Sequence, residues 1–336
     1  MEILMAEGVP GSWSVADIEE LLASAGVGTP IASVEVRDDW NGPAMRIALE
    51  DGARCRITIF PEEKAQARKE AALSDRVATE THVPVPPILG VDIDASIGPQ
   101  PSILALDPDG LPVFDIAGLS PTNQRRLFEE MGASIARLHT AFAFGEFGVV
   151  GETGDSIPEG MNTWERWMIP QIEMALDQLD ETIQSNYLQA ISACVDDARS
   201  AFMKKFEPTL IKGTYRFPEI LVDPDSDPLI VALRGLGEAI AAPAEYGYAL
   251  AMWEYCERSN RSPSFREAFN SGYGSVRSVP SGDGFRRRRD CYRLQWLLGE
   301  LVRFTSVDDP QERNTGVEWL TRDLDRVLGG HQTDRD

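Results

Sequence analysis

Lysine is scarce in this chain of 336 residues, which has it only at positions 64, 69, 204, 205 and 212. Acidic residues number 54 against 32 Lys and Arg together, so the formal net charge is −22. Such a surface repels phosphates, and we expect no nucleic-acid partner. Molar salt favours an acidic, lysine-poor surface, because carboxylates stay hydrated there while their mutual repulsion is screened. We therefore expect a halophilic protein.

Histidine and cysteine are also rare, with three and four residues. The cysteines lie far apart without the paired spacing of a zinc site, which favours buried, reduced thiols at Cys55, Cys194, Cys256 and Cys291. No apolar run approaches the roughly 18 residues of a membrane span, so no membrane partner is expected. The first seven residues are acidic where a signal peptide would be basic, which predicts a cytoplasmic location.

The order of the predicted elements indicates an α+β fold in two lobes. Apolar alternation predicts strands over 31–36, 44–49, 54–60 and 103–106, with a helix over 61–79. Later residues favour helices over 123–142, 163–179, 185–206, 243–256, 264–269, 285–304 and 311–328, and a hairpin of 220–222 with 229–231. We therefore expect an N-terminal helical extension over 1–30, an N-lobe over 31–112, a helical C-lobe over 113–328 and a disordered tail over 329–336.

The segment 212–223 reads Lys-Gly-Thr-Tyr-Arg-Phe-Pro-Glu-Ile-Leu-Val-Asp. It resembles the catalytic loop of the aminoglycoside phosphotransferases, small-molecule kinases with a protein-kinase-like fold. That loop has His-Gly-Asp, four further residues, then Asn and an apolar strand. The resemblance implies that its Asp orients the acceptor hydroxyl and its Asn holds magnesium. Here the loop opens with Lys212, and Thr214 and Glu219 stand at the Asp and Asn positions.

Other segments extend the resemblance over roughly 32–251, about two thirds of the chain. Residues 54–61 are similar to the third N-lobe strand, where such kinases carry a lysine for the nucleotide phosphates, and this position falls on Thr58. Glu70 resembles the helix glutamate that pairs with that lysine. Residues 83–86 resemble the connector after this helix, and 132–139 resemble a long C-lobe helix that ends in Leu-His. His139 by itself is interpreted as a packed helix-end residue.

The resemblance places a second metal ligand, an Asp, on Gly235, or on Arg234 if the alignment slips by one residue. Neither residue binds magnesium, and Glu219 alone would make a weak magnesium site. Without a cation between them, Glu70 and Glu219 would face the cleft. Lys212 and Arg234 are the available partners for Glu219, and the alternative for Arg234 is that it points to solvent. A solvated helix face is the favoured interpretation of Arg286–Arg289, with an anion or partner contact as the alternative.

The combined losses predict a pseudokinase, a kinase-like protein that acts as a binding or regulatory module and transfers no phosphate. One alternative is an active kinase that uses ATP and magnesium to phosphorylate a hydroxyl or amino acceptor. A new arrangement of Lys212 and Glu219 is one way in which it could act. A second alternative is a structural partner of an active paralogue. No cofactor is expected under the leading hypothesis. The partner is an unidentified small molecule or protein.

Overall fold

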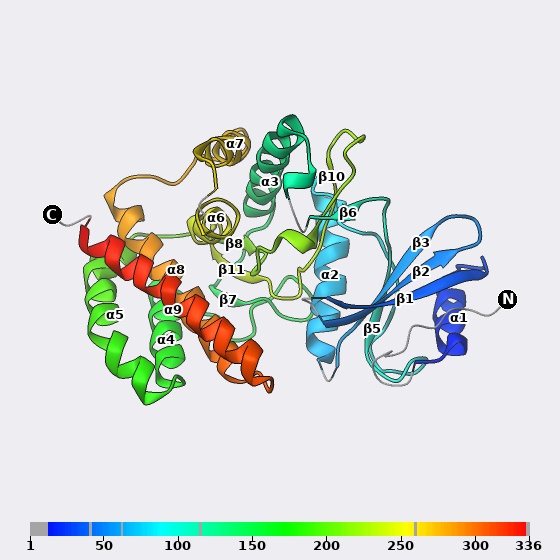
Figure 1. Ribbon diagram of the computed structural model, residues 1–336, viewed down its shortest axis with the longest axis horizontal. Coiled ribbons are helices and arrows are strands. Elements are labelled where there is room, and N and C mark those ends of the chain that lie inside the picture. Colours follow the sequence, from blue (N-terminus) through cyan, green and yellow to red (C-terminus); the bar gives the residue numbers. More distant parts are fainter. Residues whose placement is uncertain (1–12, 40–41, 62, 114–115, 259–260, 334–336) are drawn as a thin grey trace.

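The N-lobe is built on one antiparallel sheet in a computed structural model that describes residues 13–39, 42–61, 63–113, 116–258 and 261–333. The strand order is β1-β2-β3-β5-β4, and every neighbouring pair is antiparallel. Figure 1 shows this sheet at one end of the molecule and the C-lobe helices at the other. The strands are β1 (Ile31–Asp39), β2 (Gly42–Leu49), β3 (Arg54–Ile59), β4 (Ile88–Asp92) and β5 (Ser102–Leu106).

Helix α1 (Val15–Ser24) packs against the sheet and shares its core. Ser14 caps it: the hydroxyl accepts from the Asp17 amide, and the Asp17 carboxylate accepts from the Ser14 amide. Its buried side chains share one cluster with apolar side chains of the strands, including Met45, Ile47 and Ile57. This burial fixes α1 against the sheet.

The other face of the sheet looks toward helix α2 (Lys64–Glu80). In β3, buried side chains alternate with half-buried ones, as a strand with two different faces requires. Cys55 and Ile57 enter the α1 side, so Arg56 and Thr58 point the opposite way. Figure 1 shows α2 between the sheet and the C-lobe, so this second face borders the space between the lobes.

The C-lobe consists mainly of helices around a single large core. Two of them cross at glycines: a Cβ on Gly132 would lie 2.1 Å from the Phe269 carbonyl oxygen, and one on Gly272 would lie 1.8 Å from that of Glu129. Only glycine permits this approach. The helices are α3 (Pro121–Ala141), α4 (Trp164–Asp177), α5 (Glu181–Phe202), α6 (Ala244–Met252) with a π-helical continuation η4 (Trp253–Glu257), α7 (Pro263–Gly274), α8 (Asp283–Thr305) and α9 (Pro310–Thr333).

Two small antiparallel sheets carry the loop that resembles a catalytic loop. One sheet has the order β10-β9-β6, and its strand β6 comes from the connector between the lobes. Backbone hydrogen bonds tie this sheet to the connector, with the Leu233 amide donating to the Pro84 carbonyl oxygen at 2.7 Å. Segments near residues 84, 112, 220 and 233 are thereby joined. The strands of this sheet are β6 (Leu111–Pro112), β9 (Ile220–Val222) and β10 (Ile230–Leu233). The other sheet has the order β7-β11-β8, with β7 (Gly148–Val149), β8 (Pro208–Ile211) and β11 (Ile240–Pro243). Short helices lie at Ile116–Gly118 and at Phe217–Glu219, and the second is called η3.

The α+β two-lobed fold is confirmed, and so are the principal helices and strands. The sequence did not predict β4, β6, β7, β8 or β11, which are short and lack clear alternation. Disorder was expected from residue 329, but α9 continues to Thr333, because the Gly329-Gly330 pair lies inside the helix and does not end it. Residues 334–336 lie outside the described residues. Within the described part of the chain, no helix is long and apolar enough to cross a membrane.

Candidate functional site

A buried ion pair lies at the centre of the loop between β8 and β9. The Lys212 ammonium pairs with the Glu219 carboxylate, and 0 % and 3 % of their side chains are exposed. Thr214 joins both: its carbonyl oxygen accepts from Lys212 Nζ at 3.1 Å, and its hydroxyl donates to Glu219 Oε1 at 3.0 Å. The Arg216 amide donates weakly to Glu219 Oε2 at 3.4 Å. Groups of the loop itself therefore satisfy both oxygens of the carboxylate.

Gly235 lies against this pair and could not carry a side chain there. Its φ is +81°, a conformation that favours glycine. A Cβ at this position would lie 2.8 Å from Glu219 Oε1 and 3.0 Å from Lys212 Nζ. The ammonium of Lys212 therefore lies among the three positions, 214, 219 and 235, that the resemblance assigns to the acceptor-orienting residue and the metal ligands.

The residues present do not fit a magnesium ion. Magnesium requires oxygen ligands in near-octahedral geometry at about 2.0–2.1 Å. Here the one carboxylate of the loop is bound to an ammonium group, and an Asp at position 235 would collide with that pair. Among the described residues, no three His, Cys, Asp or Glu side chains are grouped so that they could hold a metal.

Glu70 and Thr58, the two N-lobe positions singled out from the sequence, line one cavity together with Glu219 and Gly235. The Glu70 carboxylate accepts a hydrogen bond from the Gly237 amide, so a backbone group now contacts it. Burial raises the pKa of Glu70, while the Leu236 and Gly237 amides and the Lys212 charge act in the opposite direction. Thr58 adds a hydroxyl and no charge.

Arg234 pairs with Asp107, which follows β5 in the N-lobe. Arg46 of β2 pairs with the same carboxylate, of which only 2 % is exposed. The expectation that Lys212 pairs with Glu219 is thus confirmed, whereas Arg234 makes an ion pair across the lobes. Asp107 was not singled out from the sequence, because Asp-Pro-Asp-Gly at 107–110 is typical of a turn. No local signal distinguishes a buried acid there.

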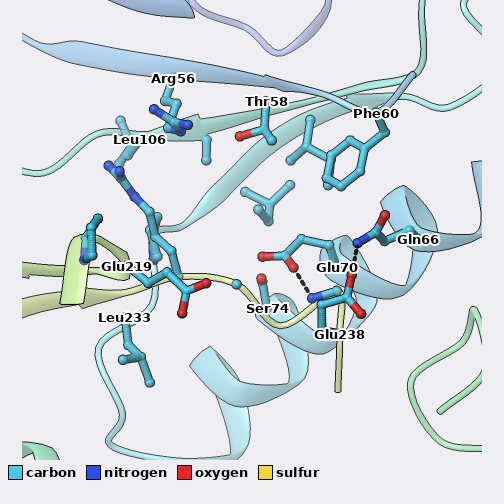
Figure 2. A pocket seen from close by; sticks show the side chains of 18 of the residues that line it. Arg56, Thr58, Phe60, Gln66, Glu70, Ser74, Leu106, Glu219, Leu233 and Glu238 are labelled. Carbon is cyan, nitrogen blue, oxygen red and sulfur yellow. Dashed lines mark hydrogen bonds between the residues drawn. The ribbon is translucent and has the colours of Figure 1, made fainter. Parts of the chain in front are cut away.

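The cavity between the lobes has a volume of about 220 Å³. Figure 2 shows Thr58 and Phe60 along one side, Arg56 beside Leu106 at one end, and Glu70, Gln66 and Glu238 at the other. Gln66 Nε2 donates to Glu238 Oε1 at 2.6 Å. The sequence did not single out Arg56, Gln66 or Glu238, because they line a cavity only through the packing of the two lobes in the folded chain.

His139 belongs to the core and not to this site. It is 1 % exposed, and its Nδ1 lies 3.0 Å from the Tyr273 hydroxyl. Burial, with the Arg277 charge, lowers the pKa of His139 to about 3. The imidazole is therefore neutral at ordinary pH, in agreement with a packed helix-end residue.

The run Arg286–Arg289 is only in part the solvated face that the sequence favoured: Arg286 is exposed, Arg287 and Arg289 are half-buried, and Arg288 is internal. Arg288 is 4 % exposed and donates to both oxygens of Glu245, at 2.5 and 2.9 Å, and to the Ala201 carbonyl oxygen. It is internal because α8 packs against α5 and α6 at this point. Free, buried thiols at all four cysteines agree with the prediction.

Comparison with known proteins identifies the family. A model of the phosphotransferase enzyme family matches residues 34–291, well over half of the chain. The chain therefore belongs to the phosphotransferase enzyme family. The comparison with curated proteins found no match.

Solved structures of aminoglycoside phosphotransferases share the fold. A thermostable mutant of aminoglycoside phosphotransferase APH(4)-Ia, in ternary complex with AMP-PNP and hygromycin B, is 14% identical with a TM-score of 0.66, over 93% of this chain and 97% of that one. The GDP complex of a mutant aminoglycoside 2′-phosphotransferase-IIIa is 17% identical with a TM-score of 0.66, over 93% and 98%. A putative aminoglycoside phosphotransferase from Ralstonia eutropha is 16% identical with a TM-score of 0.61, over 92% and 98%. At these identities the likeness establishes the fold alone.

Proposed function

We propose that this family member is a pseudokinase: a binding or regulatory module that transfers no phosphate and binds a small molecule or a protein segment between its lobes without magnesium. The observation that carries this proposal is the position of the Lys212 ammonium, paired with Glu219 against Gly235. An internal cation is held where the resemblance expects the residues that bind metal and orient the acceptor.

The requirements of phosphoryl transfer support the same proposal. The reaction relies on cations that neutralise the β- and γ-phosphates and on a residue that orients the attacking group. Thr58 supplies no charge to the phosphates, and Thr214 is not a base near neutral pH. The hydroxyl of Thr214 is already donated to Glu219, so it is directed away from any acceptor.

The retained cavity favours binding over a purely structural role. Its lining joins the sheet, α2, the connector and the segment after β10, so a ligand there would contact both lobes. A bound ligand would therefore stabilise one arrangement of the lobes, which is how a binding module without chemistry can regulate a partner.

A direct test is transfer from ATP and from GTP to aminoglycosides, sugars and amino alcohols, with and without magnesium, in low and in high salt. We expect no magnesium-dependent transfer. We also expect that adding a nucleotide together with magnesium does not shift the melting temperature of the protein. Glu219→Ala is the diagnostic variant, because it removes the remaining carboxylate of the loop. Turnover by the wild type that disappears in Glu219→Ala refutes the proposal.

A further inference from the structure

An open groove lies on the C-lobe, apart from the cavity between the lobes. Its volume is about 600 Å³. Its walls come from the residues that follow α5, the junction of β11 with α6, and the segment between α7 and α8. Figure 1 shows α5 and the connection from α7 to α8 in the part of the C-lobe away from the N-lobe sheet. The groove shares no lining residue with the cavity between the lobes.

Basic side chains from two separate segments meet in this groove. Lys204 and Lys205 follow α5, and Arg277 follows α7. The two lysines are exposed, and they are two of only five in a chain with a net charge of −22. Lys204 Nζ lies 5.5 Å from the centroid of the Phe206 ring, and Arg277 donates to the His139 carbonyl oxygen at 2.8 Å. None of these three cations forms an ion pair with a residue that the structure describes.

Two carboxylates also line the groove, and one of them is neutralised from within the core. Glu245 accepts from Arg288 at 2.5 and 2.9 Å and from the Tyr292 hydroxyl at 2.7 Å. Glu207 is exposed, and in the described part of the chain it has no ion-pair partner. Among the lining residues, three cations therefore stand against one carboxylate that is not neutralised. This balance favours a ligand with more than one negative charge.

The dipole of α5 explains part of this charge. Lys204 and Lys205 follow the C-terminus of the helix, where cations are favourable. This effect does not account for Arg277, which comes from a different segment and faces the same groove. In a chain with 54 acidic residues, three cations without a carboxylate partner on one concave surface indicate a place where an anion is attracted.

The remaining walls are mainly apolar. Phe206 is half-buried, and the Arg288 guanidinium lies 5.1 Å from the centroid of its ring. Binding sites for small molecules commonly combine apolar walls with a few placed polar groups. The apolar wall residues are Phe206, Pro243, Ala244, Val279 and Pro280.

We propose that the groove binds a small organic phosphate, with its doubly charged phosphate group at Lys204, Lys205 and Arg277 and its apolar body against Phe206. Lysine binds phosphate as a point charge, and a guanidinium group that donates to one carbonyl oxygen keeps further N–H donors for phosphate oxygens. This inference goes beyond the proposed function and does not depend on it. Glu207 immediately precedes β8, whereas the loop that begins with Lys212 follows the other end of this strand.

The test compares three compounds that separate the charge from the apolar body. Phenyl phosphate carries two charges and a ring, benzenesulfonate carries one charge and the same ring, and inorganic phosphate carries two charges without a ring. Binding is measured by calorimetry on the full chain at about pH 8, where the phosphate group is a dianion because its second pKa is about 6. The ionic strength is held at one value at which the wild type is folded. We expect phenyl phosphate to bind at least about tenfold more tightly than either of the others.

A double variant locates the charges. Lys204→Gln/Lys205→Gln should weaken phenyl phosphate at least about tenfold, and the exposure of both lysines predicts that the variant folds. The control, Lys64→Gln/Arg322→Gln, removes the same number of positive charges from exposed ion pairs elsewhere. It should leave the affinity unchanged, because distant exposed charges are screened by salt. Melting temperatures show that both variants are folded.

The inference is overturned if phenyl phosphate does not bind, if benzenesulfonate or inorganic phosphate binds as tightly, or if the control variant loses as much affinity as the lysine variant. Binding of a short single-stranded oligonucleotide through the two lysines, without binding of phenyl phosphate, would assign the groove to nucleic acid and also refute the inference. Each of these results leaves the pseudokinase proposal intact, because the groove and the cleft share no residue. Magnesium-dependent turnover refutes the pseudokinase proposal and leaves this inference intact.

Discussion

The Lys212 ammonium and the Glu219 carboxylate form an ion pair that is almost completely buried, with 0 % and 3 % of the two side chains exposed. Desolvating two charges costs several kcal/mol each, and their attraction offsets this cost only when further hydrogen bonds complete the site. Thr214 supplies such bonds to both partners. The loop is thereby closed by its own charges, and each charge depends on the other.

Removing one partner should therefore be far more damaging than removing both. We expect Lys212→Met to lower the free energy of unfolding by about 3–5 kcal/mol, because Glu219 is left charged and buried, and Lys212→Met/Glu219→Leu to recover much of the loss. The measurement is a double-mutant cycle by denaturant unfolding. The exposed pair Arg322 and Glu318 is the control and should couple by less than about 1 kcal/mol. Additive effects at Lys212 and Glu219 would show that they do not support each other.

A side chain at position 235 should disturb the same pair. Gly52 offers a matched comparison: its φ is +89°, close to the +81° of Gly235, but no atom lies within 4 Å of the Cβ it would carry. Gly52→Ala should cost about 1–2 kcal/mol from backbone strain alone. Gly235→Ala should cost about 1–3 kcal/mol more, because its Cβ would press on Glu219 and Lys212.

The additional cost of Gly235→Ala over Gly52→Ala has its own control. In the background Lys212→Met/Glu219→Ala the neighbouring atoms are changed or removed, so Gly235→Ala should then cost about as much as Gly52→Ala. The measurement is the free energy of unfolding with and without Gly235→Ala, in the wild-type chain and in this background. Equal costs for Gly52→Ala and Gly235→Ala in the wild-type chain would mean that the ion pair shifts and accommodates the new methyl group without strain.

The sequence predicted local relationships in this site and missed the distant ones. Lys212 and Glu219 are seven residues apart within one loop, and their opposite charges indicate pairing directly. Arg234 and Asp107 are 127 residues apart and come from different lobes, so their contact depends on how the lobes close. The Gly237 amide that reaches Glu70 is 167 residues away and belongs to the backbone, which carries no signature of its contacts.

The same distinction holds for the fold. Long amphipathic helices such as α3 and α8 were predicted because their periodicity persists over several turns. The short strands β8 and β11 pair only with segments far along the chain, and four residues of sequence do not specify that pairing. The expected domain boundaries remain predictions.

Acid should destabilise the protein through His139. The pKa of His139 in the folded state is lowered to about 3 from the ordinary value of 6.5, so the unfolded chain binds a proton that the folded one excludes. Stability is therefore complete above about pH 6.5 and is lost as the pH falls from there toward 3, by up to about 1.4 kcal/mol for each pH unit. We expect His139→Asn to be less stable at neutral pH but to show a shallower slope between pH 6 and 4, measured by urea unfolding. An unchanged slope would assign the acid sensitivity to other groups.

Stability should also depend on salt, because the net charge of −22 repels itself when screening weakens. The Debye length grows from about 3 Å at 1 M salt to about 10 Å at 0.1 M, so exposed carboxylates begin to interact across the surface, while buried pairs such as Lys212 with Glu219 are screened little at either concentration. We expect the melting temperature to fall steeply as sodium chloride is removed.

A variant with glutamine at four exposed acids should lose part of this salt dependence without a change in the core. Suitable positions are Glu19, Glu20, Glu159 and Glu173. Sucrose in place of salt controls for general stabilisation and should not restore the melting temperature of the wild type at low ionic strength. A melting temperature that is the same at 0.1 M and 1 M salt, or a salt response that the four substitutions leave intact, would contradict both the repulsion argument and the expectation of a halophilic protein.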